Sequence, residues 1–95
     1  MKITHEPEQC AFVARDAQGN HMGEIEYKRG DDNRLSATHT RVDREFRGRG
    51  VAEALLDELA GYARDSGAKI VPICTYVQAA FKRSPKKYQD VMVKE

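Results

Sequence analysis

Polar and apolar positions alternate along the first half of the chain, and the period of this alternation predicts strands. Residues 22–28 alternate with a period of two, and a short apolar run, Ala11–Arg15, precedes them across the turn-forming residues 16–20. A linker this short favours a hairpin. The β-branched residues of Arg34–Val42 predict a third strand after a second turn at residues 30–33, which completes an antiparallel meander. In this meander Ala11–Arg15 is expected to be an exposed edge strand, able to pair with a partner.

The apolar period becomes helical after the meander. The residues that recur at this spacing are Val51, Ala52, Leu55, Leu56, Leu59 and Ala60, with Tyr62 or Ala63 continuing the stripe. A stripe of this kind is typical of an amphipathic helix. The helix is expected to end at Ser66 and Gly67, because glycine adopts the left-handed conformation of a helix C-terminus at little cost.

The remaining residues predict a βαβ unit. The apolar run 68–75 predicts a buried strand, and Pro72 within it indicates an edge, a bulge or a place where neighbouring strands separate. Because a strand, a crossover helix and a second strand of one sheet must run parallel, residues 35–75 predict a βαβ unit. Residues 76–82 can form a short second helix. The expected fold is a single α+β domain over residues 1–95, with a mostly antiparallel sheet, one parallel βαβ unit and a long amphipathic helix packed on it.

Composition narrows the classes of function. Sixteen basic and fifteen acidic side chains give a net charge of +1, so no overall basic field favours nucleic acid, and we expect no nucleic-acid partner. No apolar stretch approaches the roughly 20 residues that span a bilayer, and we expect no membrane partner. Two cysteines and no apolar leader predict a cytoplasmic protein. The histidines and cysteines lack the spacing of metal ligands, so no metal site is expected. The sequence does not predict an oligomeric state.

The most informative motif joins a strand to the start of the amphipathic helix. It consists of Arg47, Gly48, Arg49, Gly50, Val51 and Ala52. The first turn of a helix leaves backbone amides unpaired, and small residues let phosphate oxygens approach them. The motif is neither G-x-G-x-x-G nor a P-loop. One interpretation is a site for phosphate groups, and the alternative is that the glycines only shape a tight turn.

This motif resembles the R/Q-x-x-G-x-G/A signature of the GNAT superfamily of acetyltransferases. The string from Thr38 to Val42, THTRV, and the later string from Cys74 to Val77, CTYV, resemble the small single-domain GNAT-like proteins. The resemblance covers residues 35–91 and implies a minimal GNAT-like fold that binds acetyl-CoA through the amides of residues 47–52. Residues 16–21 have room only for a turn, where typical members place helices that shape the acceptor pocket. The amine acceptor is therefore not identified: small amines, protein lysines and N-termini are all open.

Candidate catalytic residues lie near the expected opening for a thioester. Strand alternation is expected to put His39 on one face with Leu35, Ala37 and Arg41, and Cys74 on one face of the next strand, so that the two could meet. A thiolate beside an imidazole is a competent nucleophile, although free cysteine is often inert packing. The resemblance implies a tyrosine that protonates the departing CoA thiolate; Tyr76 fits its position better than Tyr88.

The remaining basic, histidine and cysteine side chains carry weaker signals. The 3′-phosphate of CoA could meet the basic cluster of Lys82, Arg83, Lys86 and Lys87, but a solvated surface is an equal interpretation. Cys10 is expected to be structural, and His5 and His21 to be solvated.

Three functions follow in order of preference. The first is an acetyl-CoA-dependent N-acetyltransferase that acts on an unidentified amine, by direct attack or through an acetyl-thioester on Cys74. The alternative is a CoA- or acyl-CoA-binding module with little or no turnover. A protein-interaction domain that binds no cofactor is the third.

Overall fold

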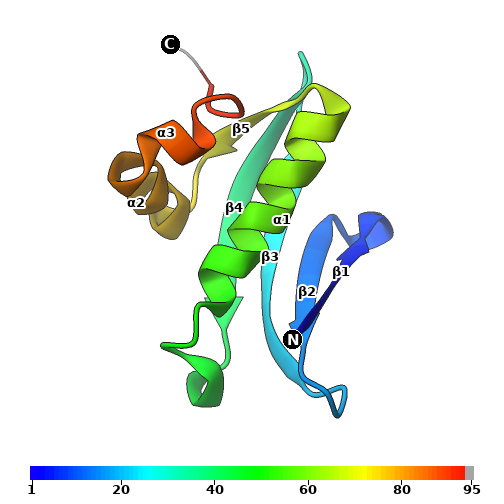
Figure 1. Cartoon of the computed structure of the whole chain (residues 1–95). Helices are drawn as coiled ribbons and strands as arrows, with labels where there is room; N and C mark the ends of the chain where they lie inside the picture. Colours follow the sequence, from blue (N-terminus) through cyan, green and yellow to red (C-terminus); the bar gives the residue numbers. More distant parts are fainter. Residues whose placement is uncertain (94–95) are drawn as a thin grey trace.

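The strands of the protein form one sheet in the order in which they follow each other along the chain (Figure 1). The computed structural model describes residues 1–93. The strands are β1 (Lys2–Glu6), β2 (Ala11–Arg15), β3 (His21–Arg29), β4 (Arg34–Val42) and β5 (Lys69–Pro72). All neighbours pair antiparallel except β4 and β5, which run parallel. The predicted α+β class, with one βαβ unit in a mostly antiparallel sheet, is confirmed.

The long helix α1 (Val51–Ser66) packs across one face of the sheet, over β2, β3 and β4 (Figure 1). Its start and end agree with the sequence-based expectation, and Gly67 ends it at a φ of 69°. Its buried side chains are Val51, Leu55, Leu56, Leu59, Ala60 and Ala63. This is the predicted stripe except for Ala52, which is half-buried, and the stripe forms the centre of the hydrophobic core.

The sequence analysis missed the first strand. β1 pairs with β2 over its whole length, so Ala11–Arg15 is an internal strand. The prediction that it is an exposed edge strand is wrong. His5 of β1 is also not simply solvated: the ring stacks on Phe12 at 4.2 Å between centroids, and Nε2 lies 2.6 Å from the Tyr27 hydroxyl oxygen. The other histidine expected to be solvated, His21, is half-buried and makes hydrogen bonds with Asp43.

Two helices follow the short strand β5 and close the end of the core. They are α2 (Thr75–Arg83) and α3 (Pro85–Tyr88), and the second was not expected. The buried Tyr88 donates a hydrogen bond of 2.7 Å to Asp57 Oδ1, which fastens α3 to α1. Burial and then this carboxylate raise the pKa of Tyr88 to about 12. No helix in residues 1–93 has the length and apolar character needed to cross a membrane.

Two glycines give opposite predictions for stability. A Cβ on Gly61, inside α1, would meet no atom within 4 Å, whereas a Cβ on Gly23 would lie 2.6 Å from the Arg41 carbonyl oxygen. Gly61→Ala should therefore stabilise the fold by about 0.5–1 kcal/mol, because it lowers the backbone entropy of the unfolded chain. Gly23→Ala should destabilise it by about 1–3 kcal/mol through overpacking. Urea unfolding of the two variants checks both, and equal stabilities would contradict the packing described for Gly23.

The two partly buried histidines should have opposite effects on the pH dependence of stability. Burial and then Arg29 lower the pKa of His5 below 6.5, so its contribution to stability falls as pH drops below 6.5. The hydrogen bond with Asp43 and then that with Glu24 raise the pKa of His21, so its contribution is present below 6.5 and lost as pH rises through the folded-state value. Urea unfolding near pH 5.5 and near pH 8 should show that His21→Gln costs more at the lower pH. His5→Gln should cost more at the higher pH.

Candidate active site

Strands β4 and β5 separate halfway along β4 and leave an opening. They pair only from Arg34 and Lys69 to Ala37 and Pro72. The amide of Ile73, the next one due to bond β4, donates to the carbonyl of Val71 at 3.0 Å instead, so the chain turns and β5 ends at Pro72, where the sequence indicated that strands could separate. After Pro72 the chain turns away into α2, while β4 runs on to Val42 (Figure 1). The strand edge of residues 38–42 therefore faces the start of α2 instead of another strand.

A groove of about 300 Å³ lies at the far end of this edge, where β4 leads into α1. Its lining comprises Val42, Phe46, Arg47, Gly48, Gly50, Val51, Ala52, Glu53 and Tyr76. Five of the six residues of the predicted phosphate-binding turn are among them. The sixth, Arg49, lies with its guanidinium carbon 5.5 Å from the centroid of the Phe46 ring.

The floor of the groove is the exposed start of α1. Gly48 and Gly50 have φ values of 79° and 77°, a left-handed conformation that side chains adopt only with strain. The first bond of the helix runs from the amide of Ala54 to the carbonyl of Gly50, so the amides of residues 51–53 have no partner within the helix. These amides, the positive end of the helix dipole and the guanidinium of Arg47 suit the pyrophosphate of a CoA thioester.

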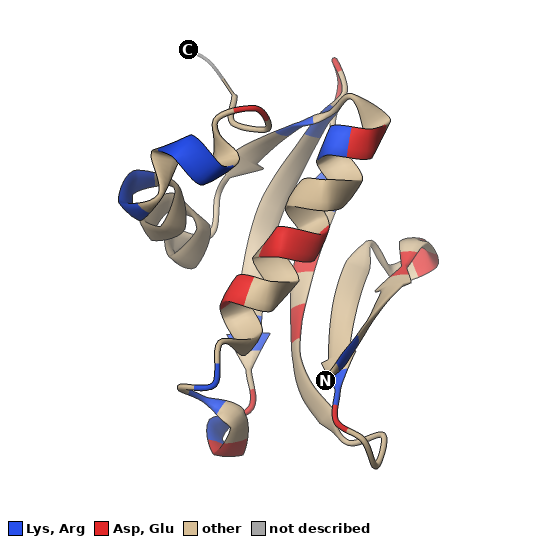
Figure 2. Cartoon of the chain, viewed as in Figure 1, with Lys and Arg blue, Asp and Glu red and all other residues tan. Residues whose placement is uncertain are grey.

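Basic residues gather in the segment before α1 and on α2 and α3 (Figure 2). Arg41, Arg44, Arg47 and Arg49 lie before α1, while the second basic cluster lies on α2 and α3. Lys87 of that cluster donates to Asp57 of α1 at 3.1 Å, which raises the pKa of the lysine. This lysine is thus an ion-pair partner of α1, and the contact of the cluster with a 3′-phosphate stays a prediction.

A bulge in β4 changes the faces on which its side chains lie. Glu26 of β3 pairs with His39, but the next residue of β3, Tyr27, pairs with Ala37, so Thr38 is an extra residue in β4. Such an insertion reverses the alternation of the strand. Ala37 faces the core as expected, but beyond the bulge Thr40 is half-buried and His39 exposed.

The prediction that the side chains of His39 and Cys74 lie close together is therefore wrong. The side chain of His39 is 68% exposed, and its Nδ1 lies 3.8 Å from Glu26 Oε1. The thiol of Cys74 instead donates to Thr40 Oγ1, at 3.5 Å. Thr40 was part of the recognised string THTRV, but the alternation of a regular strand placed it on the wrong face.

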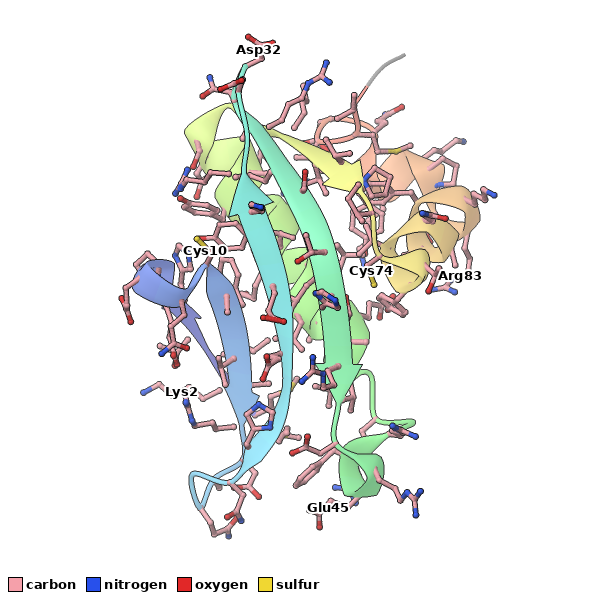
Figure 3. All side chains as sticks on the ribbon, turned by 180° about the vertical axis from the view of Figure 1, so that it is seen from behind. Lys2, Cys10, Asp32, Glu45, Cys74 and Arg83 are labelled. Atoms are coloured by element: carbon pink, nitrogen blue, oxygen red, sulfur yellow. The ribbon has the colours of Figure 1, made fainter. Side chains whose placement is uncertain are left out.

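Cys74 is the N-cap residue of α2 and lies beside β4, half-buried (Figure 3). Its amide donates to the carbonyl of Ala37 at 2.8 Å, which holds it against β4. Burial raises the pKa of its thiol, but hydrogen bonds with the Thr40 hydroxyl and with the amides of Val77, Tyr76 and Thr40 outweigh burial and lower it overall. The environment therefore favours a thiolate.

The two candidate tyrosines have different surroundings. Tyr76 lines the groove, and burial is the main cause that raises the pKa of its hydroxyl, which therefore carries its proton at neutral pH. Tyr88 is buried, and its hydroxyl is bonded to Asp57, outside the lining of the groove. The arrangement favours Tyr76 as a proton donor, in line with the sequence-based choice, although its catalytic role stays a prediction.

Comparisons with known proteins agree with this geometry. A family model described as GCN5-related N-acetyl-transferase matches residues 11–91. A GCN5-like protein of Staphylococcus aureus, solved by NMR, is 29% identical with a TM-score of 0.78, over 99% of this chain and 89% of that one. A search of curated proteins gave no significant match.

Two larger proteins share the fold over part of their length. Nourseothricin acetyltransferase is 29% identical with a TM-score of 0.60, over 77% of this chain and 46% of that one. A GNAT family N-acetyltransferase of Escherichia coli, solved in complex with CoA, is 23% identical with a TM-score of 0.58, over 63% of this chain and 37% of that one. The chain thus spans less than half the length of these two proteins.

Two glycines at opposite ends of α1 provide a test of the turn as a phosphate site. Gly50 and Gly67 both have left-handed φ values, 77° and 69°, and in both a Cβ would have open space, so replacement by valine strains the two sites alike. Gly50→Val should also displace the amides of the groove and weaken CoA binding by about tenfold or more. Gly67→Val should leave the dissociation constant unchanged. Calorimetric titration at a temperature where both variants are folded measures this; equal affinities would exclude the turn as the site.

Proposed function

This chain belongs to the GCN5-related N-acetyltransferase family, and we propose that it transfers an acetyl group from acetyl-CoA to an amine acceptor at the opening between β4 and α2. The observation that carries the proposal is the coincidence of two features along one free strand edge. The groove at the start of α1 provides unpaired amides for phosphate groups, and Cys74 with a lowered thiol pKa lies at the start of α2.

Acetyl-CoA supplies an activated thioester whose acyl group can pass to a nucleophile. In the proposed binding mode the amides of residues 51–53 and the guanidinium of Arg47 hold its phosphate groups. The unpaired edge of β4 is available to hydrogen-bond the arm that leads to the thioester. This mode uses residues of β4, α1 and α2, including the turn of residues 47–52 that the resemblance implied.

In the covalent route Cys74 is the nucleophile. Its Sγ forms a bond to the acyl carbon while the carbon–sulfur bond of the donor breaks, and the thiol proton passes to the departing sulfur. Tyr76, protonated at neutral pH, is placed in the groove to give that proton and to regain one from Cys74. The amine then attacks the acetyl group on Cys74 and restores the thiol.

In the direct route the amine attacks the donor without an acyl-enzyme. A backbone N–H near Cys74 then stabilises the oxyanion. His39 or an ordered water takes the proton of the amine. His39 suits this task only for an acceptor that approaches from the face of the sheet opposite α1, because that is the face on which it is exposed with Glu26 beside it.

One observation favours the alternative of a CoA-binding module with little turnover. Between β2 and β3 the chain makes only a tight turn, in which the amide of Asp16 donates to the carbonyl of Asn20 at 3.0 Å. No helix stands there to shape an acceptor pocket, so the side of the sheet opposite α1 is left open (Figure 3). A domain built in this way could bind the donor without selecting an acceptor.

Ligand-dependent unfolding and mass spectrometry distinguish the covalent route, the direct route and the CoA-binding module. A ligand at 100 times its dissociation constant adds about 2.7 kcal/mol, so acetyl-CoA and CoA should raise the unfolding midpoint by several degrees, and ATP should not. For the covalent route, incubation with acetyl-CoA should add one acetyl group on Cys74. Cys74→Ala should lose both this adduct and turnover, while Cys10→Ser should keep them.

Each contrary outcome has a different meaning. Full turnover of Cys74→Ala with a panel of amines would exclude the covalent route and leave the direct one. A midpoint shift with CoA but no acetylation of any amine or of Cys74 would favour the binding module. The absence of any shift would contradict the proposed cofactor site and make a protein-interaction domain the better interpretation.

A further inference from the structure

The thiol of Cys74 lies among hydrogen-bonding groups that come from two different elements. Thr40 Oγ1 of β4 is 3.5 Å from its Sγ, and the backbone amides of Thr40, Tyr76 and Val77 help to lower the pKa of the thiol. The last two amides belong to the first turn of α2, a nine-residue helix whose dipole has its positive end there. The groups that favour the thiolate are thus neutral donors rather than a neighbouring imidazole.

We propose that Thr40 is the positioning residue that controls the reactivity of Cys74 and that the activation of this thiol does not involve His39. The inference rests on the proposed function only in its consequence for catalysis, because the reactivity of the thiol can be measured without it. It assigns a task to a side chain for which the sequence analysis gave none.

A hydroxyl suits this task because it can follow the proton. It accepts a hydrogen bond from the neutral thiol, as the structure shows, and after a rotation it donates one to the thiolate. Its partner stays in place because the amide of Cys74 is bonded to the carbonyl of Ala37. The same contact can therefore support both protonation states of the sulfur.

The bulge of β4 explains why threonine and not histidine faces the sulfur. With Thr38 as the extra residue, Thr40 lies on the side of the opening and His39 on the opposite face beside Glu26. Other titratable groups at the opening are Tyr76 of α2 and Glu53 of α1, both of which line the groove. Neither is a cation, and the one cation of the groove lining, the guanidinium of Arg47, is charged throughout this range, so near neutral pH no group among these neighbours gains or loses a positive charge.

The matched pair Thr40→Val and Thr38→Val isolates the contact. Both variants replace a hydroxyl of β4 by a methyl group of similar shape, but the hydroxyl of Thr38 donates to the carbonyl of Glu26, 3.3 Å away on β3. Iodoacetamide is the probe, and its rate of reaction with Cys74 is followed against pH. Digestion with trypsin places the two cysteines in separate peptides, so mass spectrometry can use Cys10 as an internal measure of general unfolding.

The expected result is specific to Thr40. Loss of one charge-assisted hydrogen bond reduces the thiolate fraction about tenfold, so Thr40→Val should react about tenfold more slowly at neutral pH, with its pH midpoint moved upward. Thr38→Val should keep the wild-type profile, and Thr40→Ser, which retains the hydroxyl, should restore most of the rate. Reaction at Cys10 should be the same in all variants.

Two outcomes would overturn the inference. One is a wild-type profile for Thr40→Val; the other is a displaced midpoint in His39→Gln with none in Thr40→Val. Because iodoacetamide requires neither acetyl-CoA nor an acceptor, these outcomes are independent of turnover. If Thr40→Val slows alkylation while Cys74→Ala still turns over at the wild-type rate, the inference stands and the covalent route of the proposed function fails.

Discussion

The pairing of β4 with β5 ends at Pro72, because the amide of the next residue, Ile73, turns back to the carbonyl of Val71 at 3.0 Å instead of reaching β4. The end of β5 is then tied to α2 instead of to β4, because the side-chain amide of Gln78 donates to the carbonyls of Pro72 and Ile73 at 3.1 Å and 3.2 Å. The amide of Cys74 donates to the carbonyl of Ala37 and its thiol donates to Thr40 Oγ1, and these bonds keep the start of α2 against β4. Every feature of the candidate site lies along the strand edge that this divergence leaves free.

Two helices begin at this edge, and their N-termini act on different parts of the same opening. The start of α1 packs against the sheet at Gly23. A side chain there would contact both the backbone of β4 and the side chain of Val51. The start of α2 is held by Cys74. Because each N-terminus carries unpaired amides and partial positive charge, one end of the opening favours phosphate oxygens and the other favours a thiolate. The fold thus presents two helix starts at which backbone groups, with few charged side chains, favour an anion.

The sequence predicted the elements whose patterns report burial over many residues. Strands β2, β3 and β4, helix α1 and the glycine turn of residues 47–52 were predicted correctly, because alternation, apolar runs, helical spacing and glycines each leave a mark in the order of residues. The strand β1 was missed because its residues, KITHE, include a single apolar side chain, Ile3, and its pairing with β2 is a long-range property. The four-residue helix α3 is too short to show a period.

The site was predicted less completely, and the bulge is the reason. One extra residue in β4, Thr38, reverses the face on which every later residue of the strand lies. The amino-acid composition of β4 does not differ from that of a regular strand. The predicted face of His39 is therefore wrong. The predicted position of the turn before α1 is correct, because glycines and a helix start are local features of the sequence. Chemistry that depends on which face a strand side chain occupies cannot be derived from period two alone when a bulge intervenes.

In the proposed function, donor binding and acceptor recognition involve different parts of this chain. The groove and Cys74 involve β4, α1 and α2, whereas the open face opposite α1 displays paired side chains of β3 and β4 (Figure 3). There Glu24 lies opposite Arg41, and Glu26 lies opposite His39. A tight β2–β3 turn therefore removes walls from the acceptor side without disturbing the contacts that would hold CoA. In the proposed function, an acceptor on this face would be selected by charge and hydrogen bonding across the sheet surface, because these four side chains lie outside the three grooves at α1 and α2.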